Sequence, residues 1–150
     1  MLKLKELLEL DKMKYGNSIK EKHKKRMKRE LVYINNPIIP HNPPPINSSR
    51  ETLKELHWLI DYNNGLVNEI MVKEGDDVKD SFRQFLESKN LEYPKQYVKE
   101  IIKDSGKIIY ELKYKYNRPR PAQVAKYLQI EGFETTTLES MHTPSYPSGH

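Results

Sequence analysis

The chain has 150 residues, of which 36% are hydrophobic and 31% are charged, and its formal net charge is +5. The length suits one domain, but the low hydrophobic content predicts a lean core. The absence of cysteine excludes disulfide scaffolds, thiolate zinc sites and cysteine nucleophiles. The basic balance favours anionic partners such as phosphate esters, nucleic acids or acidic lipid headgroups.

Residues 1–35 are expected to form a basic N-terminal arm or helix. Within them, residues 20–29 read KEKHKKRMKR, which predicts a solvated helix, with a nucleic-acid or membrane-surface patch as the alternative. No aromatic residue interrupts this run to stack on bases, so nucleic acid is the less favoured partner. The start of the chain has no apolar run typical of a signal peptide, and no stretch approaches the roughly 20 apolar residues of a membrane span. We therefore expect a cytoplasmic protein.

Residues 36–150 are expected to form the N-terminal part of a helical phosphatase-type domain. They begin with an extended connector, because residues 36–47 hold five prolines. Ser48 and Glu51 then form a capping-box pattern, and an apolar stripe continues from there. Further helices are predicted, after a break at residues 75–77, over residues 78–86, 98–116 and 121–128, with a loop over residues 129–147. No alternating strand pattern appears, so the expected fold is an all-α helical bundle.

Lys113 and Arg120 form the first candidate phosphate-binding pair. Lys113 lies on the flank of the apolar stripe of its helix, where the side chain either reaches solvent or enters a polar pocket. Arg120 precedes a proline at a predicted helix start, where a guanidinium and main-chain N–H groups favour an anion. Arg118 also precedes a proline, but the residue in the corresponding upstream position is Glu111, a carboxylate that would repel phosphate. The spacing therefore favours Arg120.

The segment Pro147-Ser148-Gly149-His150 is the second candidate. Ser148 offers a hydroxyl donor, and Gly149 lets the main chain approach an anion without a side chain in the way. His150 can hold or release a proton near neutral pH, so it can protonate a leaving alkoxide as a general acid. With the upstream lysine and arginine, this segment predicts a phosphate site in which His150 is catalytic.

These two patterns resemble the first two signature motifs of the type 2 phosphatidic acid phosphatase and vanadium haloperoxidase superfamily. That group includes bacterial non-specific acid phosphatases and lipid phosphate phosphatases. The resemblance implies an all-α bundle that hydrolyses phosphomonoesters through a phosphohistidine intermediate and needs no metal. It also implies a set of groups that bind the phosphate oxygens: Lys113, Arg120, Ser148 and Gly149. His150 would protonate the leaving group.

Two alternatives to phosphatase activity remain. Vanadate is a tetrahedral oxyanion like phosphate, so the same motifs fit a haloperoxidase that uses vanadate as its cofactor. A basic module that binds nucleic acid or an anionic surface without catalysis is the other alternative.

The resemblance also implies a third motif, Ser-Arg-x5-His-x3-Asp, which supplies the nucleophilic histidine. No such motif follows His150, so we expect this chain to be inactive alone. Ser49-Arg50 with His57 and Asp61 imitates it, but the spacing is off by one residue and the segment precedes the first motif. We interpret this imitation as a coincidence. A bundle without its last helices would expose apolar faces, which favours a homo-oligomer.

Overall fold

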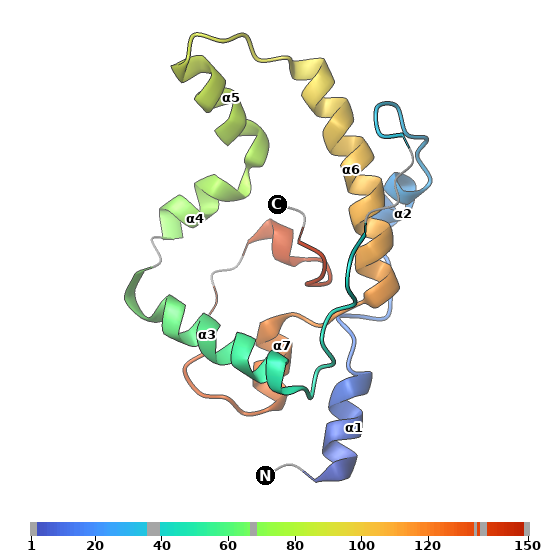
Figure 1. Cartoon of the computed structure of the whole chain (residues 1–150), viewed down its shortest axis with the longest axis vertical. Helices are drawn as coiled ribbons and strands as arrows, with labels where there is room; N and C mark the ends of the chain where they lie inside the picture. Colours follow the sequence, from blue (N-terminus) through green and yellow to red (C-terminus); the bar gives the residue numbers. More distant parts are fainter. Residues whose placement is uncertain (1–2, 36–39, 67–68, 134, 136–137, 149–150) are drawn as a thin grey trace.

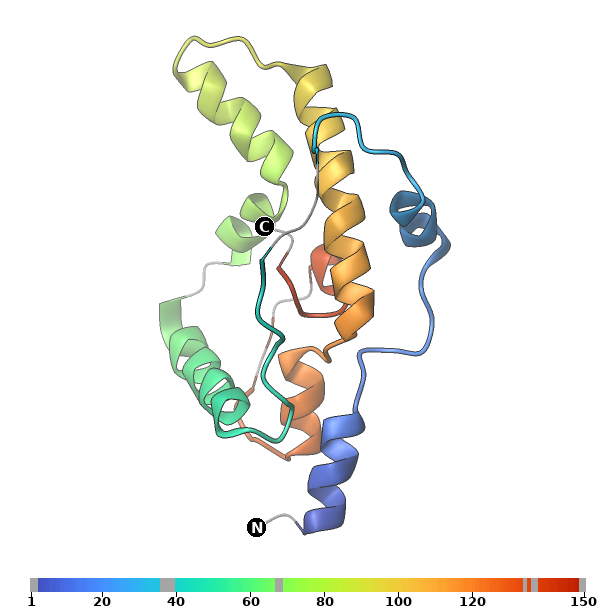
Figure 2. The same ribbon diagram turned by 45° about the vertical axis from the view of Figure 1, so that its right-hand side comes forward.

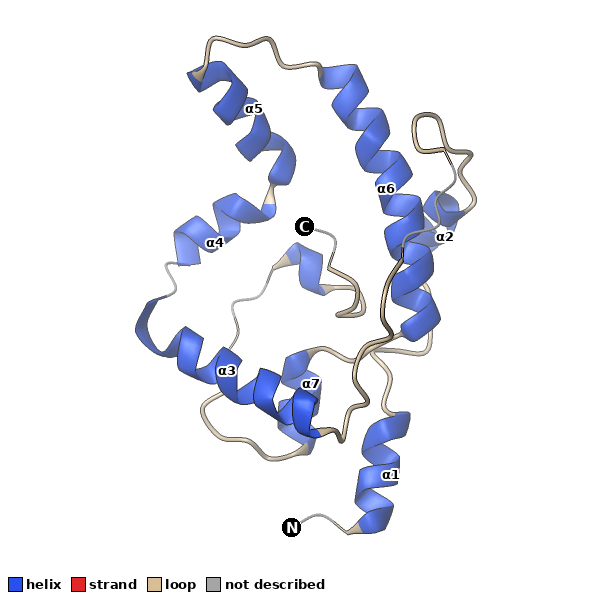
Figure 3. Cartoon of the chain, in the orientation of Figure 1, coloured by secondary structure: helices blue, strands red, loops and turns tan. Residues whose placement is uncertain are grey.

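The protein is all-helical over the residues that its computed structural model describes (Figures 1 and 3). These are residues 3–35, 40–66, 69–133, 135 and 138–148. The helices are α1 (Leu4–Lys12), α2 (Glu21–Met27), α3 (Arg50–Leu66), α4 (Glu69–Asp76), α5 (Val78–Ser88), α6 (Lys95–Tyr116) and α7 (Pro121–Tyr127), followed by the 3-10 turn η1 (Glu139–Met141). The expected all-α class is therefore confirmed. None of the helices in the described part of the chain combines the length and apolar content needed to cross a bilayer.

The helix that opens the second half of the chain begins one residue later than the capping pattern predicted. Ser49, not Ser48, caps α3, because its hydroxyl accepts the N–H of Thr52 (3.1 Å). Ser48 is engaged elsewhere, since both its main-chain N–H and its hydroxyl donate to the carboxylate of Asp11 (2.8 and 2.9 Å). Local pattern alone favoured Ser48 as the helix cap, but its hydrogen bonds to Asp11, 37 residues away in sequence, prevent this role.

The predicted breaks before α6 and α7 are confirmed, whereas the break before α5 is confined to Asp77, because α4 includes Gly75 and Asp76. Asp77 caps α5 by accepting the N–H of Asp80 (3.1 Å). Helix α6 ends where Asn117 adopts a left-handed conformation (φ 48°) and donates its N–H to Lys113 O (2.7 Å). Pro121 then occupies the first turn of α7, where its missing N–H costs no hydrogen bond.

A small hydrophobic core joins the beginning, middle and end of the chain. It brings together buried side chains of α1, α3 and α7: Leu10, Leu56, Val124 and Ala125. Asn47 fixes the same junction, because its side-chain amide donates to Leu10 O (2.8 Å) and Met13 O (3.1 Å). The core is as lean as the composition predicted. The division of the chain at residue 35 stays a prediction.

The basic segment of residues 20–29 packs along α6 through its helix α2. His23 is buried and stacks on the ring of Tyr110, with the ring centres 4.2 Å apart. His23 Nδ1 also forms a hydrogen bond with the hydroxyl of Tyr114 (2.7 Å). The neighbouring basic side chains of α2 remain exposed. The helix is therefore amphipathic, and its buried face contains His23 in contact with the aromatic rings of α6.

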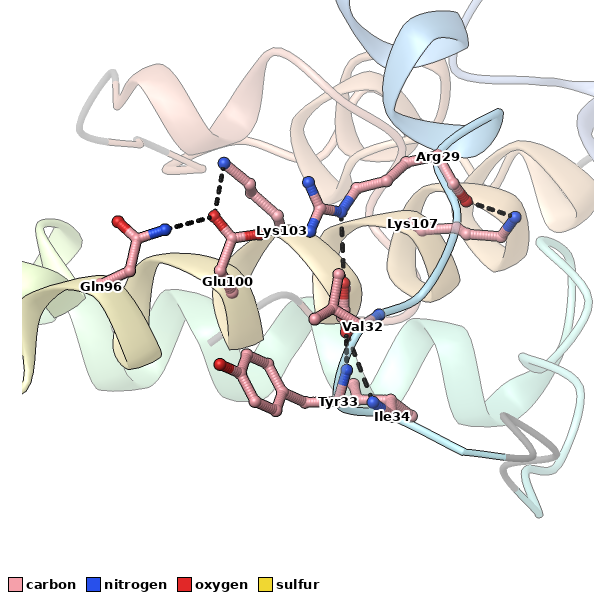
Figure 4. Close-up of polar contacts among 9 residues, drawn as sticks. Arg29, Val32, Tyr33, Ile34, Gln96, Glu100, Lys103 and Lys107 are labelled. Atoms are coloured by element: carbon pink, nitrogen blue, oxygen red, sulfur yellow. Dashed lines mark hydrogen bonds and ion pairs between the residues drawn. The ribbon is translucent and has the colours of Figure 1, made fainter.

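Polar contacts hold the chain that follows α2, including Arg29 and residues 32–34, against α6 (Figure 4), and Asp104 of α6 accepts several of these hydrogen bonds. Its side chain is fully buried, and its Oδ2 accepts the main-chain N–H groups of residues 32–34 at 2.8–3.3 Å. Arg29 donates to the other oxygen (3.2 Å) and also pairs with Glu100. These hydrogen bonds, led by that of Tyr33, lower the pKa of Asp104 to about 2, so the carboxylate stays charged.

Helices α3, α4 and α5 follow one another on one side of the molecule and α6 lies on the other (Figures 1 and 2). Both views place the segment of residues 138–148 between α4 and α6. No described side chain of α5 is buried, and Phe82 and Phe85 are exposed. Residues of α4, α5 and α6 line a common cleft, together with residues of the 138–148 segment.

Candidate oxyanion-binding site

Lys113 is buried inside the molecule, with 6% of its surface exposed. Helix α6 directs its side chain to the segment that follows η1, where Nζ donates to Pro144 O (2.7 Å). Burial, and then the charge of Arg120, lower the pKa of Lys113 to about 8. Of the two positions that the sequence left open for this lysine, the structure shows the inward one.

Arg120 is held at the start of α7 with its guanidinium against the same segment. Its main-chain N–H donates to Gln123 Oε1 (2.8 Å), which fixes the turn into the helix. Its Nε donates to Thr143 O (2.7 Å), and Nη2 donates to Ser140 O (2.8 Å) and Thr143 Oγ1 (3.1 Å). Burial lowers the pKa of Arg120. The two cations therefore meet the same short segment of main chain.

Arg118 has a different environment, although only one residue separates it from Arg120. Its Nη2 donates to Glu55 Oε2 (2.6 Å), so an ion pair with α3 neutralises it. Within the described residues, neither Lys113 nor Arg120 forms an ion pair with a carboxylate. The charge of Arg120 acts on Lys113, and the more distant charge of Asp76 acts on Arg120 and raises its pKa against the effect of burial. Two neighbouring cations whose hydrogen-bond partners are neutral oxygens are electrostatically suited to an anion.

The segment of residues 138–148 brings the second sequence motif to the same place. Ser145 anchors it, because its N–H donates to Arg118 O (3.0 Å) and its hydroxyl donates to Pro119 O (2.8 Å). Ser148 is exposed and lines the same cleft as Lys113 and Arg120. The predicted site residues Gly149 and His150 lie outside the described residues.

The cleft has a volume of about 820 Å³ and a basic lining. Residues of α2, α4, α5 and α6 contribute to it, together with Arg120 and the segment from Glu139 to Ser148. Its described lining includes seven lysine or arginine side chains and three carboxylates. Lys22 and Glu139 partly neutralise each other as an ion pair (3.5 Å). The net charge of the described cleft lining is positive, which attracts anionic ligands.

The lining residues that sequence reasoning missed include His23, Arg26 and His142. His23 and Arg26 come from the basic arm, and nothing in that run indicated contact with α6. Burial, followed by the charges of Lys22, Lys20 and Arg26, lowers the pKa of His23 to about 4, so this imidazole is neutral at physiological pH. His142 could have been noticed, because it lies eight residues before His150 in the same loop.

The imitation of the third motif lies elsewhere. His57 is exposed on α3, where its Nδ1 is bonded to Leu53 O (2.8 Å), and it is not part of the cleft lining. Asp61 and Arg50 are exposed as well. This geometry agrees with interpreting the spacing as a coincidence. In the described part of the chain, no cluster of three or more acidic or histidine side chains could hold a metal ion.

Comparison with known proteins adds no relative. No family model, no curated protein and no solved structure matches the chain. The functional argument therefore depends on the residues of the cleft and on the spacing of the two motifs.

Proposed function

We propose that Lys113 and Arg120 bind the phosphoryl group of a phosphomonoester, in a phosphatase of the type 2 phosphatidic acid phosphatase kind. The observation that carries the proposal is the pair itself: Lys113 is buried, Arg120 is half-buried, and burial together with the charge of Arg120 lowers the pKa of Lys113. Among the described residues both cations bond to neutral oxygens and neither forms an ion pair with a carboxylate. Burying like charges together costs stability unless an anion lies between them. A phosphate dianion supplies that charge.

Both cations keep donors for a ligand. Lys113 uses one of its three N–H groups on Pro144 O. Arg120 uses Nε and Nη2, and no hydrogen bond of its Nη1 to a described residue is formed. The hydroxyl of Ser148 lies on the same cleft wall. A tetrahedral oxyanion that accepts from these groups would be held through several of its oxygens at once.

In this proposal His150 protonates the leaving alkoxide while Gly149 N–H and Ser148 hold the phosphoryl oxygens. The phosphohistidine route needs a second histidine, whose nitrogen forms a bond to phosphorus as the P–O bond to the leaving group breaks. The 150 residues contain no Ser-Arg-x5-His-x3-Asp motif, so we assign them phosphate binding and leaving-group protonation only.

Calorimetric titration with inorganic phosphate tests the binding claim. The wild-type chain should bind phosphate, and Lys113→Met or Arg120→Gln should weaken binding by about tenfold or more, because each removes a charge-assisted hydrogen bond. Arg118→Gln is the matched control, since its partner is Glu55. Equal affinities in all four proteins, each with an unchanged circular dichroism spectrum, would contradict the proposal. The 150-residue chain should not hydrolyse p-nitrophenyl phosphate, and robust turnover that His150→Ala abolishes would contradict this expectation.

Vanadate-dependent halide oxidation is the second candidate. It is favoured by the same observation, because the donors of Lys113 and Arg120 recognise the charge and shape of any tetrahedral oxyanion. Bromide oxidation in the presence of vanadate and hydrogen peroxide, without phosphate hydrolysis, would favour this activity over the phosphatase.

A further inference from the structure

The cleft extends beyond the space that one phosphoryl group needs. From Lys113 it follows α6 past Tyr110 to Gly106, and all three residues line it. A helix rises about 1.5 Å per residue, so Gly106 lies about 10 Å along the axis from Lys113 and Tyr110 lies about 5 Å from it. A second ligand group could therefore lie along this wall.

Arg26 of α2 lies on that part of the wall as an exposed side chain in contact with α6. It runs across Gly106, where a Cβ added to the glycine would be 3.5 Å from Nη1 and 3.6 Å from Cδ of the arginine. The guanidinium carbon lies 5.6 Å from the centre of the Tyr110 ring, which is cation–π distance. Both contacts are with one face of α6, and the rest of the guanidinium remains accessible to a ligand.

The charge of Arg26 is not matched by an ion pair with a carboxylate among the described residues, whereas Arg29, one turn later, pairs with Glu100 and Asp104. The other cleft-lining groups of α2 are His23, which is neutral, and Lys20 and Lys22, of which Lys22 pairs with Glu139. On the opposite wall, Asp76 and Asp77 accompany Lys73 and Lys79, and Asp77 is engaged as the cap of α5. The wall around Arg26 is thus positive.

We infer that Arg26 is a second anion subsite, and that the substrate carries a second phosphoryl group about 5–10 Å from the one held by Lys113 and Arg120. This inference rests on the proposed function, because it takes that first subsite as given. A planar guanidinium stacked on an aromatic ring can grip a phosphoryl group through two parallel hydrogen bonds. The spacing fits the ends of a short linear polyphosphate or the two esters of a bisphosphorylated sugar.

Titration of the 150-residue chain with three probes tests the inference: inorganic phosphate, tripolyphosphate and fructose 1,6-bisphosphate. At constant ionic strength, tripolyphosphate or the bisphosphate should bind more tightly than phosphate. Arg26→Gln should weaken binding of that probe about tenfold and leave phosphate affinity within about twofold. Lys25→Gln is the matched control, because Lys25 is an exposed cation of the same helix that does not line the cleft.

The outcomes separate the two proposals. Phosphate binding that depends on Lys113 and Arg120, without any Arg26-dependent gain for either larger probe, would overturn the second subsite and leave the proposed function standing. An equal loss with Arg26→Gln and Lys25→Gln would also overturn it, since a general charge effect would then suffice. Absence of phosphate binding would remove the proposed function and the second subsite with it.

Discussion

Lys113 and Arg120 bond to the carbonyl oxygens of two neighbouring residues, Pro144 and Thr143, each at 2.7 Å. One short stretch of main chain therefore holds two cations that come from the end of α6 and the start of α7. Carbonyl dipoles orient these side chains but do not neutralise them. The site keeps its positive charge while its geometry is fixed, which is what recognition of an oxyanion requires.

Oxyanion binding should weaken as the pH rises through about 8. Burial and Arg120 lower the pKa of Lys113 to about this value, and only the protonated amine both donates and attracts. Sulfate is the suitable probe, because its own charge does not change in this range. Titration calorimetry between pH 7 and 9.5 should show a loss for the wild-type chain and a weak, nearly constant affinity for Lys113→Met.

The same pKa shift predicts the pH dependence of stability, with a sign that can be worked out. The ordinary lysine pKa is 10.5, so between about pH 8 and 10.5 the unfolded chain binds more protons than the folded chain. Stability should therefore rise with pH in this window, because the cost of burying the charge is relieved. Urea unfolding of wild type and Lys113→Met measures it; equal slopes in the two proteins would show that Lys113 is not the responsible group.

Arg120 and Arg118 should respond differently to the same substitution. Arg120→Lys removes the planar fork that bonds to Thr143 and Ser140, so oxyanion affinity should fall about tenfold even though the charge is kept. Arg118→Lys changes only a contact with Glu55 and Thr52, so affinity should stay within about twofold. Dissociation constants for phosphate provide the comparison, and a larger loss in the Arg118 variant would reverse the assignment.

Much of the helical layout could be predicted from the sequence, because proline positions and apolar periodicity are local signals. Helices α5, α6 and α7 lie where these signals placed them. Lys113 and Arg120, which the local spacing paired, both contact the segment after η1, whereas Arg118 pairs with Glu55; phosphate binding by the pair stays a prediction. The pairing by spacing did not need the three-dimensional structure.

The contact between α2 and α6 could not be predicted in the same way. His23 of α2 stacks on Tyr110, and the residues just after α2 bind the buried Asp104 of α6, about 70 residues away in sequence. A pattern of apolar positions treats such an aspartate as solvent-facing. Arg26 and His23 were missed for this reason, since α2 reaches the cleft wall only through that contact.

Asp104→Asn should loosen the N-terminal arm from α6. The asparagine side chain keeps one oxygen acceptor, but its NH₂ group replaces the other oxygen. That NH₂ donor would face the N–H groups of residues 32–34 or the guanidinium of Arg29, which are also donors, so hydrogen bonds would be lost. We expect the melting temperature to fall by several degrees and the amides of residues 32–34 to lose hydrogen-exchange protection. Asp80→Asn, which changes a half-exposed ion pair of α5, is the control and should have a small effect.

Acid titration gives Asp104 a second signature. Because its pKa is lowered to about 2, its contribution to stability is complete above the ordinary aspartate value of 3.8 and is lost as the pH falls from there through about 2. Unfolding followed by circular dichroism over this range should be steeper for wild type than for Asp104→Asn. Parallel curves would mean that another carboxylate carries the acid sensitivity.

Gly106→Ala should stabilise the protein without harming the cleft. Gly106 lies in the interior of α6, where glycine is less stable than alanine by about 0.5–1 kcal/mol. The added Cβ would lie 3.5 Å from Arg26 Nη1 and 4.0 Å from the Tyr110 ring, which is ordinary van der Waals contact. Urea unfolding should show this gain, and tripolyphosphate affinity should be unchanged.

Gly106→Val adds two methyl groups at the same position and should displace the guanidinium, so it should weaken tripolyphosphate binding while phosphate binding persists. If Gly106→Val binds tripolyphosphate as tightly as Gly106→Ala does, the position of Arg26 over Gly106 has no role in binding.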